Sequence, residues 1–144
     1  MIVVSDTSPI SSLFLIGQLE LLPAIFSNII VPQKVMAELL VLEREFGHDL
    51  SSVKIAAWIE VRSIQANLEV ERLAQFLDAG ESEAIALAKE LNADYLLVDD
   101  RKGREAASED GLKTMGVLGV FMLSKRAGFI TNVRPLMDDF EGTS

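Results

Sequence analysis

Two short apolar runs in this sequence end in aspartate. Residues 2–5 lead into Asp6, and residues 95–98 lead into the adjacent pair Asp99 and Asp100. Both runs have the length and aliphatic content of a strand buried on both faces. If the two strands are parallel, their carboxyl ends share one edge of the sheet, where open α/β sheets build their sites. Three carboxylates there repel one another unless a cation lies between them, so the pattern predicts a metal site.

Asp6 has two interpretations. With Thr7 and Ser8 after it, Asp6 fits the turn that starts a helix, because all three side chains can accept hydrogen bonds from free helical amides. Alternatively, Asp6 is a metal ligand, and Thr7 or Ser8 donates a hydrogen bond to it. The residues themselves leave both interpretations open.

Three glutamates on predicted helices are further candidates. Glu38 lies on the flank of an apolar helical stripe, which fits either a solvated residue or a carboxylate that reaches over the end of the sheet. Glu81 follows Asp78 by three residues, the spacing of a capping box, so we interpret Glu81 as structural. Glu83 lies roughly 200° further round the helix and cannot share that role. In the first turn, the helix dipole favours the ionised form of Glu83 near a strand end.

A basic cluster follows the aspartate pair. Asp99 and Asp100 repel each other directly after a buried strand, and Arg101, Lys102 and Arg104 come next. One interpretation is a solvated, charge-balanced helix start, although cations usually favour the other end of a helix. The other is that these basic side chains hold the phosphates of a substrate brought to the metal.

The ligand types available restrict the metal. The sequence has one histidine, His48, which we interpret as a surface loop residue, and it has no cysteine. A tetrahedral zinc site is therefore excluded, and an all-oxygen site implies Mg²⁺ or Mn²⁺. Phosphate-cradling loops and nucleophile elbows are also missing from the sequence. The lack of cysteine and of a basic secretory start predicts a cytoplasmic protein.

Charge and composition restrict the partners. The net charge of −9 argues against a protein that binds nucleic acid through bulk charge, but not against an enzyme that cuts nucleic acid through bound cations. No apolar stretch reaches about 18 residues, so we expect no membrane span. Hydrophobic residues make up 49% of the chain, which is high for a small domain. We expect part of this apolar surface to lie in a subunit or partner interface.

The elements that position these residues alternate between strands and helices, which predicts one α/β domain over residues 1–144 with a mostly parallel sheet. The predicted strands are 2–5, 28–31, 60–64, 94–98 and 112–114, the third at a sheet edge. The predicted helical segments are 8–26, 33–46, 51–59, 67–77, 80–92, 102–109 and 117–127. Ser8 is expected to be the N-cap of the first. The tail, 129–144, is expected to add a helical turn or two around 135–140.

Four segments together resemble the PIN-domain family of metal-dependent ribonucleases, which includes the VapC-type toxins of toxin–antitoxin pairs. These segments are residues 2–8, 31–39, 80–88 with the motif GExEAI, and 97–104 with the motif DDRKGR. The match covers about residues 1–128. The resemblance implies a three-layer α/β/α sandwich around a mostly parallel sheet of about five strands.

The resemblance also implies a ligand set. Asp6, Glu38, Glu83 and one or both of Asp99 and Asp100 would hold one or two Mg²⁺ or Mn²⁺ ions. Glu83 stands where most relatives have aspartate, and the longer side chain puts the metal position in doubt. The stretch 98–100 replaces a more usual Thr-x-Asp, which leaves open which aspartate is the ligand; Asp100 is favoured by its place in the motif.

The function implied by the resemblance is hydrolysis of RNA phosphodiester bonds, as the toxin of a type II toxin–antitoxin pair. The expected partners are RNA, an antitoxin protein and a second copy of the chain. One alternative is a catalytically weak PIN scaffold that acts through protein binding. Another is a phosphatase-like enzyme with Asp6 as nucleophile, which is disfavoured because such enzymes need a second aspartate where Ser8 stands.

Overall fold

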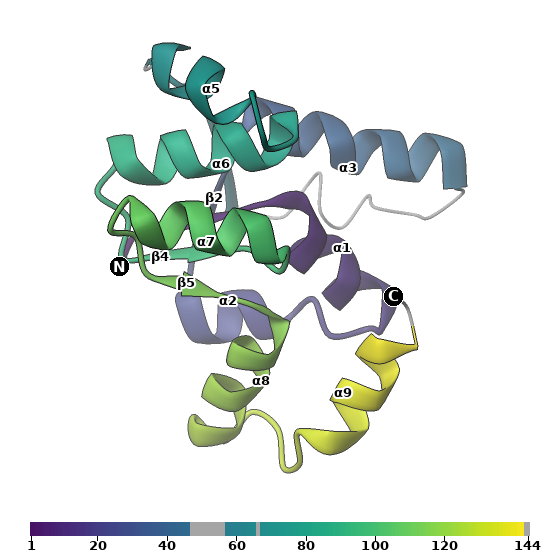
Figure 1. The fold of residues 1–144 in the computed structure, drawn as a ribbon. Coiled ribbons are helices and arrows are strands. Elements are labelled where there is room, and N and C mark those ends of the chain that lie inside the picture. Colours follow the sequence, from purple (N-terminus) through teal and green to yellow (C-terminus); the bar gives the residue numbers. More distant parts are fainter. Residues whose placement is uncertain (47–56, 66, 143–144) are drawn as a thin grey trace.

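A parallel β-sheet forms the centre of the fold (Figure 1). The computed structural model describes residues 1–46, 57–65 and 67–142. Within these residues the sheet has five strands, in the order β3-β2-β1-β4-β5, and every paired neighbour is parallel. The strands are β1 (Val3–Ser5), β2 (Ile29–Pro32), β3 (Ile59–Arg62), β4 (Tyr95–Leu97) and β5 (Thr114–Met115).

Helices cover both faces of the sheet, which confirms the predicted three-layer α/β/α architecture. Figure 1 shows α5 and α6 on one side and α2, α8 and α9 on the other. The helices are α1 (Thr7–Leu15), α2 (Leu21–Phe26), α3 (Gln33–Phe46), α5 (Asn67–Leu73), α6 (Ala79–Glu90), α7 (Arg101–Glu109), α8 (Val117–Arg126) and α9 (Arg134–Glu141).

Neighbouring strand residues point into different cores. Val3 and Leu97 pack with α1, α2 and α8, whereas Val4 and Leu96 pack with α5, α6 and α7. This alternation follows from the two-residue repeat of a strand, and all four side chains are buried. The central strands therefore need apolar residues at consecutive positions, which is why they are recognisable in the sequence.

The direction in which the chain adds strands reverses next to β1. After β1 the chain adds β2 and β3 on one side, and it then returns to place β4 and β5 on the other. Parallel sheets bind ligands at the carboxyl end of such a reversal, between the two strands concerned. Asp6 follows β1 and Asp99 follows β4, so the predicted residues lie at this position.

The first predicted helix differs most from the structure. The expected single stretch 8–26 is two helices, because Gly17 adopts a left-handed backbone (φ 72°) after α1. The predicted N-cap, Ser8, is also wrong. Asp6 occupies the cap position and α1 starts at Thr7, so Pro9 falls within the first turn, where its missing amide costs no helical hydrogen bond.

Smaller differences occur at other boundaries. The last strand starts at Thr114 rather than 112, because the Leu112 amide still bonds to the Ala107 carbonyl in the turn that ends α7. Most of the predicted helix 51–59 and His48 lie outside the described residues, while Ile59 begins β3. As predicted, β3 forms a sheet edge, and its residues are largely exposed.

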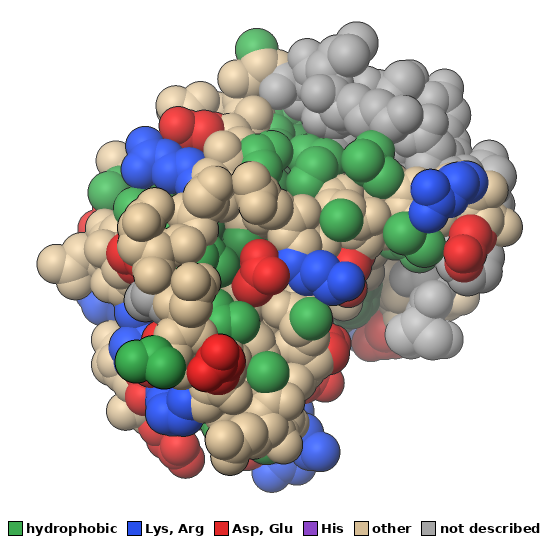
Figure 2. All heavy atoms as spheres, turned by 90° about the horizontal axis from the view of Figure 1, so that it is seen from above, with side chains coloured by type: hydrophobic (Ala, Val, Ile, Leu, Met, Phe, Trp, Pro, Cys, Tyr) green, Lys and Arg blue, Asp and Glu red, His purple; other side chains and the backbone are tan. Residues whose placement is uncertain are grey.

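The described helices and surface carry two further findings. Within residues 1–46, 57–65 and 67–142, no helix has both the length and the apolar character needed to cross a membrane. Figure 2 shows the molecule of Figure 1 from above. On this face acidic and basic side chains are interspersed and form no broad basic patch. This distribution agrees with the negative net charge.

Candidate functional site

Asp6 connects the two strands at the reversal point. Its amide donates a 2.9 Å hydrogen bond to the Leu97 carbonyl, which ties the end of β1 to the end of β4. Asp6 occupies the N-cap position of α1, but its side chain forms no capping hydrogen bond. The residue is only 5% exposed. The capping interpretation therefore fails for the side chain, and the helix does not account for the buried carboxylate.

The surroundings of Asp6 favour its protonated form when no cation is bound. Burial is the largest cause that raises the pKa of Asp6, from 3.8 to about 7. The Thr7 amide opposes this shift, whereas the carboxylates of Asp78, Glu38 and Asp100 add to it. These four acids therefore share one electrostatic environment, although they come from different segments of the chain.

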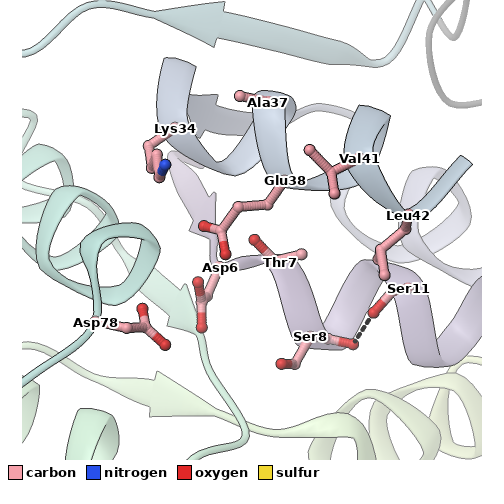
Figure 3. Close-up of a pocket in the computed structure, with 10 residues that line it drawn as sticks. All are labelled: Asp6, Thr7, Ser8, Ser11, Lys34, Ala37, Glu38, Val41, Leu42 and Asp78. Carbon is pink, nitrogen blue, oxygen red and sulfur yellow. Dashed lines mark hydrogen bonds between the residues drawn. The ribbon is translucent and has the colours of Figure 1, made fainter. Parts of the chain in front are cut away.

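Asp6 opens into a cavity of about 540 Å³ between the start of α1 and the first turns of α3 (Figure 3). The close-up shows Asp6 between Glu38 and Asp78. The cavity combines carboxylates, hydroxyls and one ammonium group with an apolar rim. Its lining residues are Asp6, Thr7, Ser8, Ser11, Lys34, Ala37, Glu38, Val41, Leu42 and Asp78.

Glu38 reaches over the end of the sheet, as one of its two interpretations predicted. Its Oε1 atom is buried without a hydrogen-bond partner in the described residues. The carboxylate packs so closely against the α-carbon of Gly80 that any side chain there would overlap it. Burial raises the pKa of Glu38, and Asp78 and Glu83 add to this, while the nearby Thr7 hydroxyl and Lys34 oppose it.

Asp78 and Glu81 join the acidic cluster. Asp78 caps α6 as predicted, because its Oδ1 accepts a 2.8 Å hydrogen bond from the Glu81 amide. Glu81 is buried, with 7% of the residue exposed, and its Oε2 has no hydrogen-bond partner in the described residues. Burial, Asp78 and Asp100 together raise the pKa of Glu81 to about 8. The capping motif therefore explains the backbone of Glu81 but not its buried side chain.

Glu83 lies beside the cavity rather than in its lining. Its Oε1 accepts a 3.3 Å hydrogen bond from the Lys34 amide at the start of α3. It lines a separate hollow of about 160 Å³ next to Gln33 and Ser63. Glu83 is still near enough to raise the pKa of Glu38. A negative charge at the first turn of α3 also suits the helix dipole.

The two adjacent aspartates point to different places. Asp100 caps α7 by accepting a 3.2 Å hydrogen bond from the Gly103 amide, and it acts electrostatically on Asp6. Asp99 instead accepts a 2.8 Å hydrogen bond from the Val117 amide at the start of α8. It lines a different groove, together with Arg104. Burial raises the pKa of Asp99, and Arg104 opposes that shift.

The predicted phosphate-binding side chains lie outside the cavity lining. Arg101 pairs with Glu105 at 2.9 Å on the exposed face of α7. Lys102 lines a shallow hollow on that helix, and Arg104 lies beside Asp99. Thr7 and Ser8 do line the cavity, but neither hydroxyl donates a hydrogen bond to the Asp6 carboxylate in the described residues, so their support of Asp6 stays a prediction.

Sequence reasoning missed Asp78, Lys34 and the side chain of Glu81. A usable signal was present, because a helix that precedes or follows a parallel strand runs antiparallel to it. Its first turn therefore lies at the carboxyl edge of the sheet, where the site forms. Polar residues in the first turns of α3 and α6 were candidates on that ground alone.

The donor chemistry of the cavity fits a hard divalent cation. Carboxylate and hydroxyl oxygens are the ligands such ions prefer, and both Glu38 Oε1 and Thr7 Oγ1 are buried without a partner in the described residues. In the described part of the chain, no three Asp, Glu, His or Cys side chains form a ready metal-binding arrangement. Binding an ion therefore requires these side chains to move toward it, and the ion would offset their mutual repulsion.

Comparison with known proteins supports the fold. The chain is similar to the structure of a PilT N-terminus domain protein from the hyperthermophilic archaeon Sulfolobus solfataricus P2, with a TM-score of 0.66 and 22% sequence identity. The match covers 86% of this chain and 93% of that protein. No curated protein matches the sequence.

A family model described as a PIN domain (DUF3368) matches residues 2–144. This match includes both strands of the reversal point and every acidic residue of the cavity. The family relationship therefore covers the site as well as the sheet, and the chain belongs to the PIN-domain family.

Proposed function

We propose that this chain is a metal-dependent endoribonuclease that hydrolyses RNA phosphodiester bonds at the Asp6 cavity. PIN domains are generally nucleases that use divalent metal ions, which supports the reaction class. The observation that carries the proposal is the Asp6 carboxylate, which is buried, makes no cap and has its pKa raised among other acids. Such an arrangement is unfavourable without a bound cation.

Asp6 and Glu38 are the central ligands in this proposal, with Asp78 and Asp100 beside them. Mg²⁺ or Mn²⁺ held there would supply an activated water and would neutralise charge on the phosphoryl oxygens. The Thr7 hydroxyl lies beside the Glu38 carboxylate, whose pKa it lowers, and is therefore placed to orient that ligand oxygen. Glu83 remains a predicted ligand, and Asp99 remains the alternative to Asp100 after β4.

The toxin role is also a proposal, and it requires a protein partner. A groove of about 610 Å³ between α8 and α9 offers a surface for such a partner. Leu118 and Met122 line it and are 48% and 59% exposed. This apolar surface also favours the second candidate function, a PIN scaffold that binds an antitoxin or a second copy of the chain.

The experiment that separates the two functions measures cleavage of a panel of structured and unstructured RNAs. We expect cleavage in Mg²⁺ or Mn²⁺ that EDTA abolishes, and we expect loss of cleavage in Asp6→Asn, which keeps the side-chain shape but removes the charge. Circular dichroism should show that the variant is folded. An active Asp6→Asn protein would rule out this site.

Metal binding can be followed without cleavage. An ion that binds the native protein raises its melting temperature. When the metal concentration is about one hundred times the dissociation constant, binding adds about 2.7 kcal/mol to the free energy of unfolding. The shift should be smaller in Asp6→Asn. If neither Mg²⁺ nor Mn²⁺ shifts the wild-type transition and no RNA is cut, the scaffold function is favoured.

A further inference from the structure

One basic side chain, Lys34, lines the carboxylate cavity. The remaining lining residues are acidic, hydroxyl-bearing or apolar. Figure 3 shows Lys34 on α3, on the same side of the helix as Glu38, one turn earlier. Lys34 is itself exposed to solvent, so its ammonium group is accessible at the mouth of the cavity.

The stability of α3 does not explain a lysine at this position. Lys34 is the second residue of the helix, where the dipole disfavours a positive charge. Lys34 and Glu38 have the i, i+4 spacing, but a lysine that precedes its glutamate is the less favourable order. The helix dipole and the order of this pair therefore give no strong stability reason for a lysine at this position.

Lys34 is among the basic residues of the described chain that form no ion pair, whereas several others are paired. Arg62 pairs with Glu60, Arg72 and Lys89 pair with Glu69, and Arg101 pairs with Glu105. For Lys34, by contrast, no ion pair within 4.0 Å occurs among the described residues. Its influence on Glu38 is a longer-range attraction that lowers the pKa of that acid.

The backbone around Lys34 is held in place. Its amide donates a 3.3 Å hydrogen bond to Oε1 of Glu83, which fixes the first turn of α3 against α6. The side chain thus starts from an anchored position, while its ammonium group is not committed to another residue. This combination suits a group that contacts a bound anion.

We propose that Lys34 binds a non-bridging oxygen of the RNA phosphodiester presented to the cavity. The inference rests on the proposed ribonuclease function and adds a substrate-binding residue to it. A single phosphate next to several carboxylates needs a compensating cation besides the metal, and a lysine ammonium supplies it through a charge-assisted hydrogen bond. No broad basic patch on the face in Figure 2 offers a substitute.

The test compares Lys34→Ala, Lys34→Arg and a control, Lys125→Ala, on a short single-stranded RNA in Mn²⁺. Lys125 is exposed in the last turn of α8 and lines neither the cavity nor the α8–α9 groove. We expect Lys34→Ala to raise KM about tenfold with a smaller change in kcat, which is the size of one charge-assisted hydrogen bond. Lys34→Arg should restore most of the loss, because the charge remains.

Two further measurements separate substrate binding from an indirect effect. The slope of log(1/KM) against log salt should become shallower by about 0.7 in Lys34→Ala, the value for one lost phosphate contact on a single strand. Mn²⁺ affinity, measured by electron paramagnetic resonance titration, should be unchanged or higher, because a positive charge has been removed.

The outcomes distinguish the two proposals. An active wild type whose KM and salt slope are the same in Lys34→Ala and Lys125→Ala overturns the role of Lys34 alone. Weaker Mn²⁺ binding in Lys34→Ala, in parallel with the KM change, also overturns it. A wild-type protein that cuts no RNA in either metal overturns the ribonuclease function, and the role of Lys34 with it.

Discussion

The Asp6 carboxylate carries an energetic cost in the metal-free protein. Its pKa is about 7 in the folded state against 3.8 ordinarily, so the native protein holds a proton that the unfolded chain releases. The unfolding free energy of the metal-free protein therefore falls as pH rises from about 4 to about 7. A bound cation removes this penalty because it favours the ionised form.

Asp6→Asn should consequently stabilise the metal-free protein at neutral pH while it abolishes cleavage. We expect a rise of roughly 1–3 kcal/mol in the unfolding free energy at pH 7.5, below the roughly 4 kcal/mol that the full pKa difference represents. Urea unfolding in EDTA at pH 4 and pH 7.5 measures this difference. A gain that is equal at the two pH values would contradict the electrostatic explanation.

Asparagine substitutions can also distinguish the roles of Asp99 and Asp100. Asparagine can replace aspartate at the Asp100 cap, and at position 99 its amide oxygen can still accept the hydrogen bond from the Val117 amide, so both variants should remain within about 1 kcal/mol of the wild-type unfolding free energy. Because Asp100 acts on Asp6 whereas Asp99 binds the Val117 amide, we expect Asp100→Asn to lose cleavage by more than about 100-fold and Asp99→Asn to retain it. The opposite pattern would assign Asp99 as the ligand.

Three helix starts each hold a buried carboxylate against a glycine. At the start of α6, Glu38 packs on Gly80. In α7, a β-carbon added at Gly103 would lie 2.6 Å from Glu81 Oε2. Before α8, a β-carbon added at Gly116 would lie 2.8 Å from Asp99 Oδ1. In each case one carboxylate oxygen is buried without a partner in the described residues. The helices can approach the acids this closely only because these positions lack side chains.

Gly80→Ala tests the closest of these contacts. The added methyl group overlaps the Glu38 carboxylate, so either α6 or Glu38 must move. We expect a loss of about 1–3 kcal/mol in unfolding free energy, together with reduced metal-dependent cleavage. Gly142→Ala is the matched control, because its β-carbon would meet only the Asp139 and Asp138 carbonyls, at 3.4 and 3.5 Å. Wild-type cleavage by Gly80→Ala would contradict the proposed position of Glu38.

The elements show how far the sequence was informative. The central strands were predictable because burial on both faces requires consecutive apolar residues, and the order of strands and helices implied the parallel sheet. The split of the first helix depended on the left-handed conformation of Gly17, which the apolar periodicity does not encode. Asp78 was visible as a cap, but its nearness to Asp6 depends on how α6 packs across the sheet.

At the scale of the whole molecule, a four-residue ion network joins α5, α6 and the end of α7. Glu69 accepts hydrogen bonds from Arg72 and Lys89, and Asp110 lies close to both basic residues. The hydrogen bonds from Arg72 and then Lys89 lower the pKa of Glu69 to about 2. The network therefore stabilises the native state when Glu69 is ionised.

Glu69→Gln should destabilise the protein near neutral pH by less than about 1 kcal/mol, because the network is partly exposed to solvent. The difference from wild type should shrink as pH falls from about 4.5 to about 2, since a lowered native pKa contributes stability only above that range. Glu105→Gln, in the exposed pair with Arg101, is the control and should have almost no effect. Chemical unfolding across this pH range measures both, and a constant difference for Glu69→Gln would refute the explanation.

The position of β1 at the centre of the sheet has a consequence for protein synthesis. Val3 pairs with Tyr95, and the Ile2 amide bonds to the Asp94 side chain, so the first strand needs a neighbour made some ninety residues later. Such distant pairing is slow and follows the emergence of both segments from the ribosome. A nascent chain that has not released β4 holds Asp6 without Asp100 beside it. The acidic cavity is thus completed only after β4 and Asp100 have left the ribosome.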